Sequence, residues 1–418
     1  MPDTGPGQPY RCYPIEDSVV AVGMGLVVPG ASSPDQFWRL LGAGVPQFGE
    51  PGDRMDIDAL WSPDPAAADK TYTRVSGFIR DFQPHPRLRA ELAAGSWSPG
   101  ELTGQWLRHS LWQALDRVTV DGARTYLAIG MTPDGGHAAE QTLLRYGARQ
   151  LAGGGDPLAG SYPDGAANLA THAPHRVVAD AVAGLVEPVE TTILDTACSS
   201  SLYAFDLGIR ALQEGQAELA LCGGAYAVNA LNLVLFSKLD GLSKTGTVRA
   251  LGRDPDGVLF SDGAAVVALK TYRRAVVDGD PILGFVRGFG GSSDGRGKAV
   301  YAPNPAGQRF ALERAWAAAG VEPSEVDWLV AHATGTAAGD AAELVALRAA
   351  APGKRWTLTS NKALIGHTGW AAGAVNVIHA LLALHRESIP GQHLTGEPVA
   401  DDGSVHVPTG PLPWPAGT

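Results

Sequence analysis

The stretch DTACSSSLYA, residues 195–204, places one cysteine between a short apolar segment and a segment of helical periodicity. The preceding residues 190–194, ETTIL, are mostly β-branched or apolar, which is typical of a buried strand. Residues 201–215, SLYAFDLGIRALQEG, space their apolar side chains as a helix does and end at a glycine. Cys198 is therefore predicted at a sharp strand-to-helix turn, where free backbone N–H groups and the helix dipole favour a thiolate. A thiolate in that position is a candidate nucleophile.

The composition excludes several classes of protein. The chain has 418 residues and a formal net charge of -11, whereas a nucleic-acid-binding protein is expected to be basic. No segment approaches the roughly 20 uninterrupted apolar residues of a membrane helix, and the first residues lack the order of a signal peptide. Three cysteines, Cys12, Cys198 and Cys222, are too few and too scattered for a disulfide framework or a zinc site. We therefore expect a cytoplasmic enzyme that binds no nucleic acid, no membrane and no metal ion.

The order of the predicted elements indicates a layered α/β fold. Residues 190–228 are predicted as strand, helix and strand, which implies parallel strands joined by a right-handed crossover. The second half of the chain alternates strands and helices in the same way. Further strands are predicted at residues 125–131, 264–271, 282–289, 326–335 and 356–367, and helices at 305–320, 341–351 and 372–388.

Two histidines occur in similar surroundings, each near the end of a predicted strand and followed by glycine and threonine. His332 begins HATGTAAGDAAE, residues 332–343, and His367 lies within SNKALIGHTGWAAG, residues 360–373. Open α/β sheets gather their reactive groups at strand ends, so these histidines are candidates for the same site as Cys198. One cysteine and two imidazoles supply a nucleophile and two groups that stabilise a developing oxyanion or move protons.

Six segments together resemble the β-ketoacyl synthases of polyketide and fatty-acid assembly, a family with the thiolase fold. They occur in the family's order: DTACSSSL, GLSKTG, FSDGAAVVALK, APNPAGQ, HATGT with GDAAE, and NKALIGHTGWAAG. Each segment alone is weak support, but six in one order are specific. The resemblance covers most of the chain and implies a thiolase-like α/β fold, with two similar halves in a layered αβαβα arrangement. The N-terminal half is expected over residues 17–270 and the C-terminal half over residues 271–418.

The resemblance also implies roles for individual residues. Cys198 matches the thiol that accepts an acyl chain. His332 and His367 match the pair that assists decarboxylation of a malonyl-type extender and stabilises its enolate. Two neutral imidazole N–H donors suit an enolate, because its charge appears only in the transition state. Further matches are Lys362, which supports the histidines, Glu343, its acidic partner, and Thr334 and Thr336, which lie beside the pantetheine arm.

The implied reaction is acylation of Cys198 followed by decarboxylative Claisen condensation, in polyketide and antibiotic biosynthesis. The implied partner is an acyl carrier protein, whose phosphopantetheine arm carries the acyl group, so no cofactor of the enzyme's own is expected. The resemblance further implies a homodimer that forms through the strand after the nucleophile helix, ELALCGGAYAV, residues 218–228. Such an apolar run would be costly to expose at a sheet edge.

The sequence departs from the family's pattern in three places. The family's Met-Asp-Pro-Gln-Gln-Arg stretch is replaced by ELTGQWLRHSLWQALD, residues 101–116, near the expected acyl tunnel and dimer contacts. The family's Ser-Asn pair is replaced by Ala363 and Leu364, which predicts a more apolar pocket beside His367. After PLPWPAGT, residues 411–418, the family's final strand and Gly-rich loop are expected to be lacking.

These departures leave two alternatives open. A ketosynthase-like acyltransferase or cyclase would act on a thioester without decarboxylation. A non-catalytic partner subunit, similar to a chain-length factor, would belong to another functional class. Such partners typically replace the cysteine, whereas Cys198 is present here.

Overall fold

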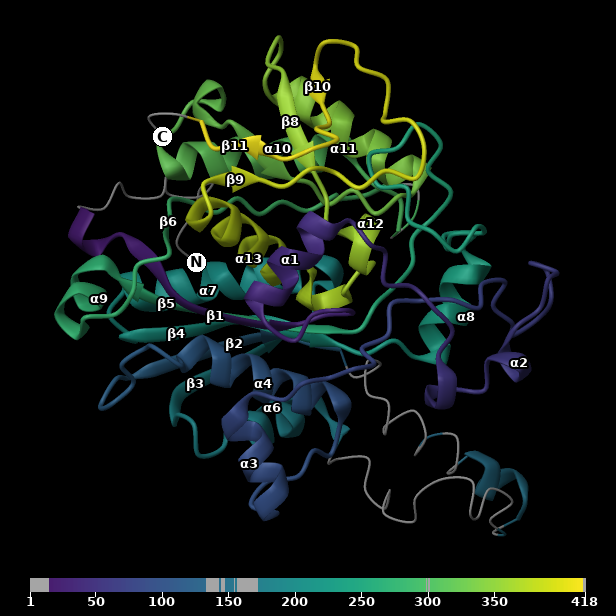
Figure 1. Ribbon diagram of the computed structural model, residues 1–418, viewed down its shortest axis with the longest axis horizontal. Helices are drawn as coiled ribbons and strands as arrows, with labels where there is room; N and C mark the ends of the chain where they lie inside the picture. The colour runs from purple at the N-terminus through teal and green to yellow at the C-terminus, as the bar shows by residue number, and fades with distance from the viewer. Residues whose placement is uncertain are drawn as a thin grey trace, which may run out of the picture.

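The structure is a computed structural model that describes residues 15–132, 143, 147–153, 155, 172–297, 299 and 301–415 (Figure 1). Cys12 lies outside these ranges. The strands are β1 (Val19–Val27), β2 (Thr125–Gly130), β3 (Pro188–Leu194), β4 (Leu219–Tyr226), β5 (Gly263–Thr271), β6 (Gly284–Val286), β7 (Trp328–Val330), β8 (Trp356–Thr359), β9 (Ser388–Ile389), β10 (Val405–His406) and β11 (Leu412–Pro413). The helices are α1 (Pro34–Ala43), α2 (Ile57–Leu60), α3 (Pro86–Ala94), α4 (Leu102–Leu115), α6 (Pro174–Val182), α7 (Ser200–Gln213), α8 (Ala230–Lys238), α9 (Tyr272–Asp278), α10 (Pro305–Ala319), α11 (Ala337–Ala350), α12 (Lys362–Ile365) and α13 (Ala372–His385).

The larger sheet has the strand order β3-β2-β4-β5-β1-β6. Strands β3 and β4 both pair with β2 in parallel, so the predicted parallel strands around the nucleophile helix are confirmed, with β2 between them. Strand β5 runs antiparallel to both β4 and β1. Short three-stranded (β10-β8-β7) and two-stranded (β11-β9) sheets complete the described topology.

The interface strand expected from the sequence, residues 218–228, is not at an edge. Strand β4 lies between β2 and β5, and all its residues are buried. The strand is apolar along its whole length because it is central in the sheet and covered on both faces. The edge beyond β2 is formed by β3, whose Val189 is 60% exposed. The expectation that β4 forms a dimer edge was therefore wrong.

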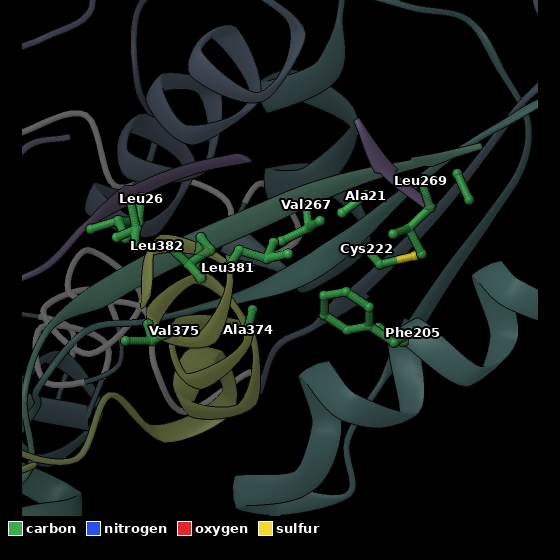
Figure 2. Packing of buried hydrophobic residues seen from close by; sticks show 14 of the residues in the cluster. Ala21, Leu26, Phe205, Cys222, Val267, Leu269, Ala374, Val375, Leu381 and Leu382 are labelled. Atoms are coloured by element: carbon green, nitrogen blue, oxygen red, sulfur yellow. The ribbon is translucent and has the colours of Figure 1, made fainter. Parts of the chain in front are cut away.

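The chain builds the five layers expected of an αβαβα fold. Helices α4 and α6 cover one face of the six-stranded sheet, where residues such as Trp106 and Val178 are buried against the strands (Figure 1). Helices α7 and α13 cover the other face. Figure 2 shows Phe205 of α7 and Leu382 of α13 packed toward strand residues such as Val267. The smaller sheet follows, with α10 and α11 packed against it through one apolar cluster.

The GMG sequence at residues 23–25 lets α4 approach the sheet closely. A Cβ atom on Gly25 would lie 2.1 Å from the carbonyl oxygen of Ser110, and one on Gly23 would lie 1.9 Å from that of Ala114. Only glycine fits at these two positions, because the backbone of α4 packs directly against β1 there. Within the ranges described above, no helix is both long and apolar enough to cross a membrane.

Candidate active site

The predicted strand-to-helix turn carries Cys198. Strand β3 leads into a 3-10 turn over Ala197–Ser199, and α7 begins at the next residue. Ala197 has φ of 52°, a left-handed conformation that non-glycine residues rarely adopt. Two hydrogen bonds hold it: its N–H donates to Asp195 Oδ1 at 3.0 Å, and its carbonyl oxygen accepts from Ser200 Oγ at 2.7 Å. The turn therefore presents Cys198 in one orientation.

His367 contacts the cysteine directly. Its Nε2 lies 2.9 Å from Cys198 Sγ, and its Nδ1 accepts the backbone N–H of Gly369 at 3.1 Å. A neutral imidazole has one donor and one acceptor nitrogen, so we assign the proton to Nε2. His367 therefore directs an N–H donor at the sulfur and is not arranged to remove the thiol proton.

The backbone and ring of His367 are both fixed. Its N–H donates to Leu259 O at 2.8 Å, and its carbonyl oxygen accepts from the N–H of Ser261 at 2.9 Å. Between these two residues, the ring of Phe260 stacks on the imidazole with centroids 5.4 Å apart. The imidazole consequently has little freedom to rotate away from Cys198.

His332 completes the cluster and, like His367, belongs to the C-terminal half of the chain. Its ring lies 5.1 Å from that of His367, with the two planes nearly perpendicular at 86°. The Glu343 carboxylate, on α11, accepts the backbone N–H of His332 at 2.7 Å and that of Ala333 at 2.8 Å. Glu343 thus holds the strained loop, in which Ala333 has φ of 27°. His332 is exposed as a residue, although protein atoms crowd its ring enough to desolvate it.

Lys362 is a buried residue close enough for its charge to act on both histidines. It is 1% exposed, and its Nζ has no hydrogen-bond partner among the described atoms. Burial lowers the pKa of Lys362 to about 8, although the charge of Glu343 opposes that shift. Burial also lowers the pKa of His367 well below its usual value, and the charge of Lys362 adds to the effect. The pKa of His332 is lowered by the same two causes, so both imidazoles are neutral near pH 7.

The resting state of Cys198 differs from the expected thiolate. Cys198 keeps some contact with solvent, yet desolvation by the surrounding protein raises its pKa. The nearby charge of Lys362 and the cysteine's own N–H lower it, but by less. The predicted helix N-terminus is present beside Cys198. The desolvation of the thiol outweighs its effect on the pKa, and desolvation cannot be predicted from the local sequence. Cys222, predicted as a small buried hydrophobe, is fully buried in the core.

The two threonines predicted beside the pantetheine arm lie in the loop after His332. Thr334 Oγ1 and Thr336 Oγ1 are 3.0 Å apart, and Thr336 is half-buried. Asp340 fixes this loop by accepting the N–H of Gly335 at 3.1 Å, and burial raises the pKa of Asp340 to about 7. The loop thus brings two hydroxyl groups to the same side of the fold as His332.

The cluster has some features of a metal site. Cys198 Sγ and one nitrogen from each histidine lie within 4.8 Å of one another, and soft metal ions bind such donors. However, Nε2 of His367 carries a proton and its Nδ1 accepts the Gly369 N–H, so this ring offers no free lone pair. The arrangement therefore suits hydrogen-bond donation around a nucleophile better than metal binding.

Sequence reasoning missed three residues beside the cluster: Asp195, Phe260 and Trp370. Phe260 stacks on His367, and Trp370 donates its indole N–H to Asp195 at 2.7 Å. Asp195 and Trp370 are 175 positions apart, so their contact depends on the tertiary fold. All three residues lie in the family's motif segments: Asp195 in DTACSSSL, Phe260 in FSDGAAVVALK and Trp370 in NKALIGHTGWAAG. The motifs therefore marked their positions, but their contacts depend on the tertiary fold.

Comparison with known proteins agrees with the geometry. The family model described as "Beta-ketoacyl synthase, N-terminal domain" matches residues 16–275, and the model described as "Beta-ketoacyl synthase, C-terminal domain" matches residues 283–394. The chain is 33% identical to polyketide synthase GfsA of Streptomyces halstedii and 35% identical to mycoketide-CoA synthase of Mycobacterium tuberculosis. Each match covers 96% of this chain but only 5% and 10% of those proteins, respectively. The chain therefore spans about a tenth or less of these two relatives.

Solved ketosynthase structures share the fold. The oxazolomycin ketosynthase domain OzmH KS7 of Streptomyces albus JA3453 superposes with a TM-score of 0.78 at 29% identity, covering 95% of this chain and 70% of that one. The ishigamide ketosynthase/chain length factor gives a TM-score of 0.79 at 25% identity, covering 95% and 93% of the two chains. Together with the two family models, these matches show that this chain belongs to the β-ketoacyl synthase family.

Proposed function

We propose that the protein is a polyketide condensing enzyme that acts on acyl-carrier-protein thioesters. The observation that carries this proposal is the donor geometry at Cys198: the Nε2–H of His367 points at the sulfur, and His332 lies beside it. A site that must hold a negatively charged oxygen near a thioester needs such donors.

The first step is acyl transfer to Cys198. The sulfur attacks the carbonyl carbon of the incoming thioester, and the carrier's pantetheine thiol leaves with the proton that Cys198 releases. Because the resting thiol has a raised pKa, this step benefits from the nearby positive charge of Lys362. Cys198 as a residue is half-buried and so keeps some contact with solvent.

The second step joins the acyl group to an extender. A malonyl thioester loses CO₂, and the electron pair of the broken bond forms an enolate on the remaining thioester. His332 and His367 stabilise the enolate oxygen, and the enolate carbon then attacks the acyl carbonyl and expels the Cys198 thiolate. In this step each imidazole donates a hydrogen bond to the enolate oxygen and keeps its proton, so each ring must be neutral. The lowered pKa values of His332 and His367 are consistent with neutral rings. Loss of one such donor typically costs on the order of 10² to 10³ in rate.

We also propose a homodimer that pairs through β3 and not through β4. Strand β3 is an edge strand with three consecutive exposed residues, Val189–Thr191. Two such strands related by a two-fold axis would pair antiparallel and continue the sheet from one subunit into the next. The pairing would cover Val189, which is 60% exposed in the single chain.

Intact-mass measurement after incubation with an acyl-carrier thioester tests the proposed function. The proposal predicts a mass increase of one acyl group on Cys198, no increase in Cys198→Ala, and CO₂ release once malonyl-carrier is added. Turnover of the acyl thioester without CO₂ release would instead support the acyltransferase or cyclase alternative. A chain that is not acylated at all would support the non-catalytic partner.

A further inference from the structure

Trp370 connects the C-terminal half of the fold to the nucleophile turn. It lies in the 3-10 turn Gly369–Ala371, directly after the His367 segment. Its indole N–H donates to Asp195 Oδ1 at 2.7 Å, and the same oxygen accepts the backbone N–H of Ala197 at 3.0 Å. One carboxylate oxygen therefore links the tryptophan to the residue that immediately precedes Cys198.

The tryptophan ring is held on its other side by Tyr226. The two rings stack with centroids 5.4 Å apart and planes 30° apart, and Tyr226 is fully buried at the end of β4. Gly369 makes this stacking possible, because a Cβ atom there would lie 2.7 Å from the tyrosine ring. Tyr226 in turn packs against Phe260, the residue that stacks on His367. The position of the indole is thus fixed by the core.

The nucleophile turn needs such support because it is strained. A left-handed conformation is unfavourable for a non-glycine residue, and Ala197 adopts it with φ of 52°. Relaxation of Ala197 toward negative φ would rotate the next residue, Cys198, away from His367 Nε2. Asp195 is exposed, so without a second partner its carboxylate would be free to turn into solvent.

We propose that Trp370 is a positioning residue for the nucleophile, which holds Asp195 so that Asp195 can keep Ala197 in its strained conformation. The inference rests on the proposed role of Cys198 as the acyl acceptor. Trp370 acts through Asp195, to which its indole N–H donates.

The arrangement has an electrostatic consequence. The negative charge of Asp195 raises the pKa of Cys198, although it is the smallest of the causes. The indole N–H offsets part of that charge by donating to the carboxylate. Loss of the N–H should therefore raise the pKa of Cys198 further, and loss of the charge should lower it. Both shifts should be small, because water screens an exposed carboxylate.

The variant Trp370→Phe removes the indole N–H and keeps an aromatic ring on Tyr226. Acylation of Cys198 by a small acetyl N-acetylcysteamine thioester, followed by intact mass, should slow about 3- to 10-fold, the value of one typical hydrogen bond. The pH midpoint of iodoacetamide labelling at Cys198 should rise slightly, and high salt should reduce that rise. The matched control is Trp97→Phe, which removes an indole N–H that donates to Asp180 O at 2.9 Å on another part of the surface. It should change neither measurement.

A double-mutant cycle separates positioning from packing. In an Asp195→Ala background, Trp370→Phe should cause no further slowing, because the residue through which it acts is gone. Asp195→Asn keeps an oxygen that can accept both hydrogen bonds but removes the negative charge. The pH midpoint of iodoacetamide labelling at Cys198 should therefore fall. The inference would be overturned if Trp370→Phe left the acylation rate unchanged. It would also be overturned if Trp370→Phe slowed acylation equally in the wild type and in the Asp195→Ala background. If the label is not on Cys198 in the wild type, the proposed function fails instead, and peptide mapping distinguishes the two results.

Discussion

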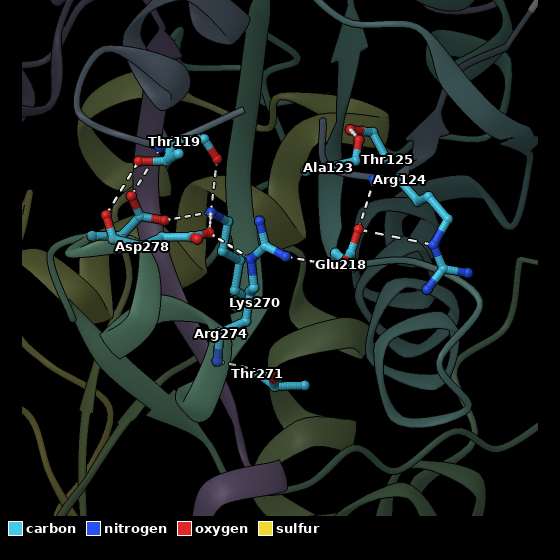
Figure 3. Close-up of polar contacts among 10 residues, drawn as sticks. Thr119, Ala123, Arg124, Thr125, Glu218, Lys270, Thr271, Arg274 and Asp278 are labelled. Atoms are coloured by element: carbon cyan, nitrogen blue, oxygen red, sulfur yellow. Dashed lines mark hydrogen bonds and ion pairs between the residues drawn. The ribbon is translucent and has the colours of Figure 1, made fainter. Parts of the chain in front are cut away.

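Two fully buried lysines should respond in opposite ways to the same substitution. Lys362 lies in the candidate active site and its Nζ has no hydrogen-bond partner, whereas Lys270 on β5 lies 2.5 Å from both Asp278 and Asp280. Figure 3 shows the Lys270 ammonium between the Asp278 carboxylate and Thr119, whose carbonyl oxygen also accepts from Lys270. Replacing each lysine with methionine removes a buried charge but keeps a side chain of similar length.

For Lys362→Met we expect a more stable protein. The pKa of Lys362 falls from 10.5 to about 8, and each unit corresponds to 1.36 kcal/mol, so the buried charge costs about 3 kcal/mol of unfolding free energy near pH 7. The cost should shrink as pH rises from about 8 to about 10.5. In that window the folded lysine has lost its proton while the unfolded lysine keeps it, which stabilises the wild type as pH increases. For Lys270→Met we expect a loss of about 3–5 kcal/mol, because two buried carboxylates lose their shared cation.

Urea unfolding of the wild type and both variants at about pH 7 and about pH 10 measures these differences directly. Lys362→Met should be more stable than the wild type at the lower pH, and the two should converge at the higher pH. The same variant should lose condensing activity. A Lys362→Met protein that is less stable at neutral pH, or equally stabilised at both pH values, would refute the assignment of Lys362 as a buried charge whose desolvation outweighs its attraction to nearby carboxylates.

Three further predictions concern the loop, the histidines and the edge strand. Glu343→Gln leaves one backbone N–H of the His332 loop without its carboxylate oxygen, so decarboxylation should slow by about 10-fold or more, measured as labelled CO₂ release. Because the pKa values of His332 and His367 are lowered, protonation of these rings should not slow decarboxylation between about pH 7 and about pH 5.5. The pKa of Asp340 is raised to about 7, so the same profile is measured in Asp340→Asn; a loss of rate with a midpoint near 6.5 in both proteins would contradict the neutral state of the histidines. Val189→Lys places a charge on the exposed edge of β3 and should convert a dimer to monomer in light scattering; an unchanged dimer would argue against pairing through β3.

Local patterns and the family motifs were sufficient for much of the fold and the site. The turn at Cys198 and the two histidine segments are encoded by neighbouring residues, and the structure brings Cys198, His332 and His367 together. The place of β4 in the sheet was not predictable, because an apolar run looks the same in a central strand and in a covered edge.

Some properties of the site depend on tertiary burial and on contacts between distant segments, and these could not be predicted from the sequence. The raised pKa of Cys198 depends on how many protein atoms surround the sulfur, and the helix dipole alone predicted the opposite direction. The link between Asp195 and Trp370 joins the two halves of the chain, so no local pattern contains it. Glu343, expected as the acidic partner of Lys362, also binds the backbone of the His332 loop through its carboxylate, a contact that no local pattern indicated.

Single-turnover CO₂ release tests the central claim most directly. Protein already acylated on Cys198 is mixed with malonyl-carrier labelled in the free carboxyl group, and released CO₂ is counted against condensed product. The wild type should release one CO₂ for each acyl group extended. His367→Ala should still accept the acyl group but release CO₂ roughly 10² times more slowly, because one N–H donor to the enolate is gone. Undiminished CO₂ release by His367→Ala, or wild-type turnover without any CO₂, would contradict the assignment of this site to decarboxylative condensation.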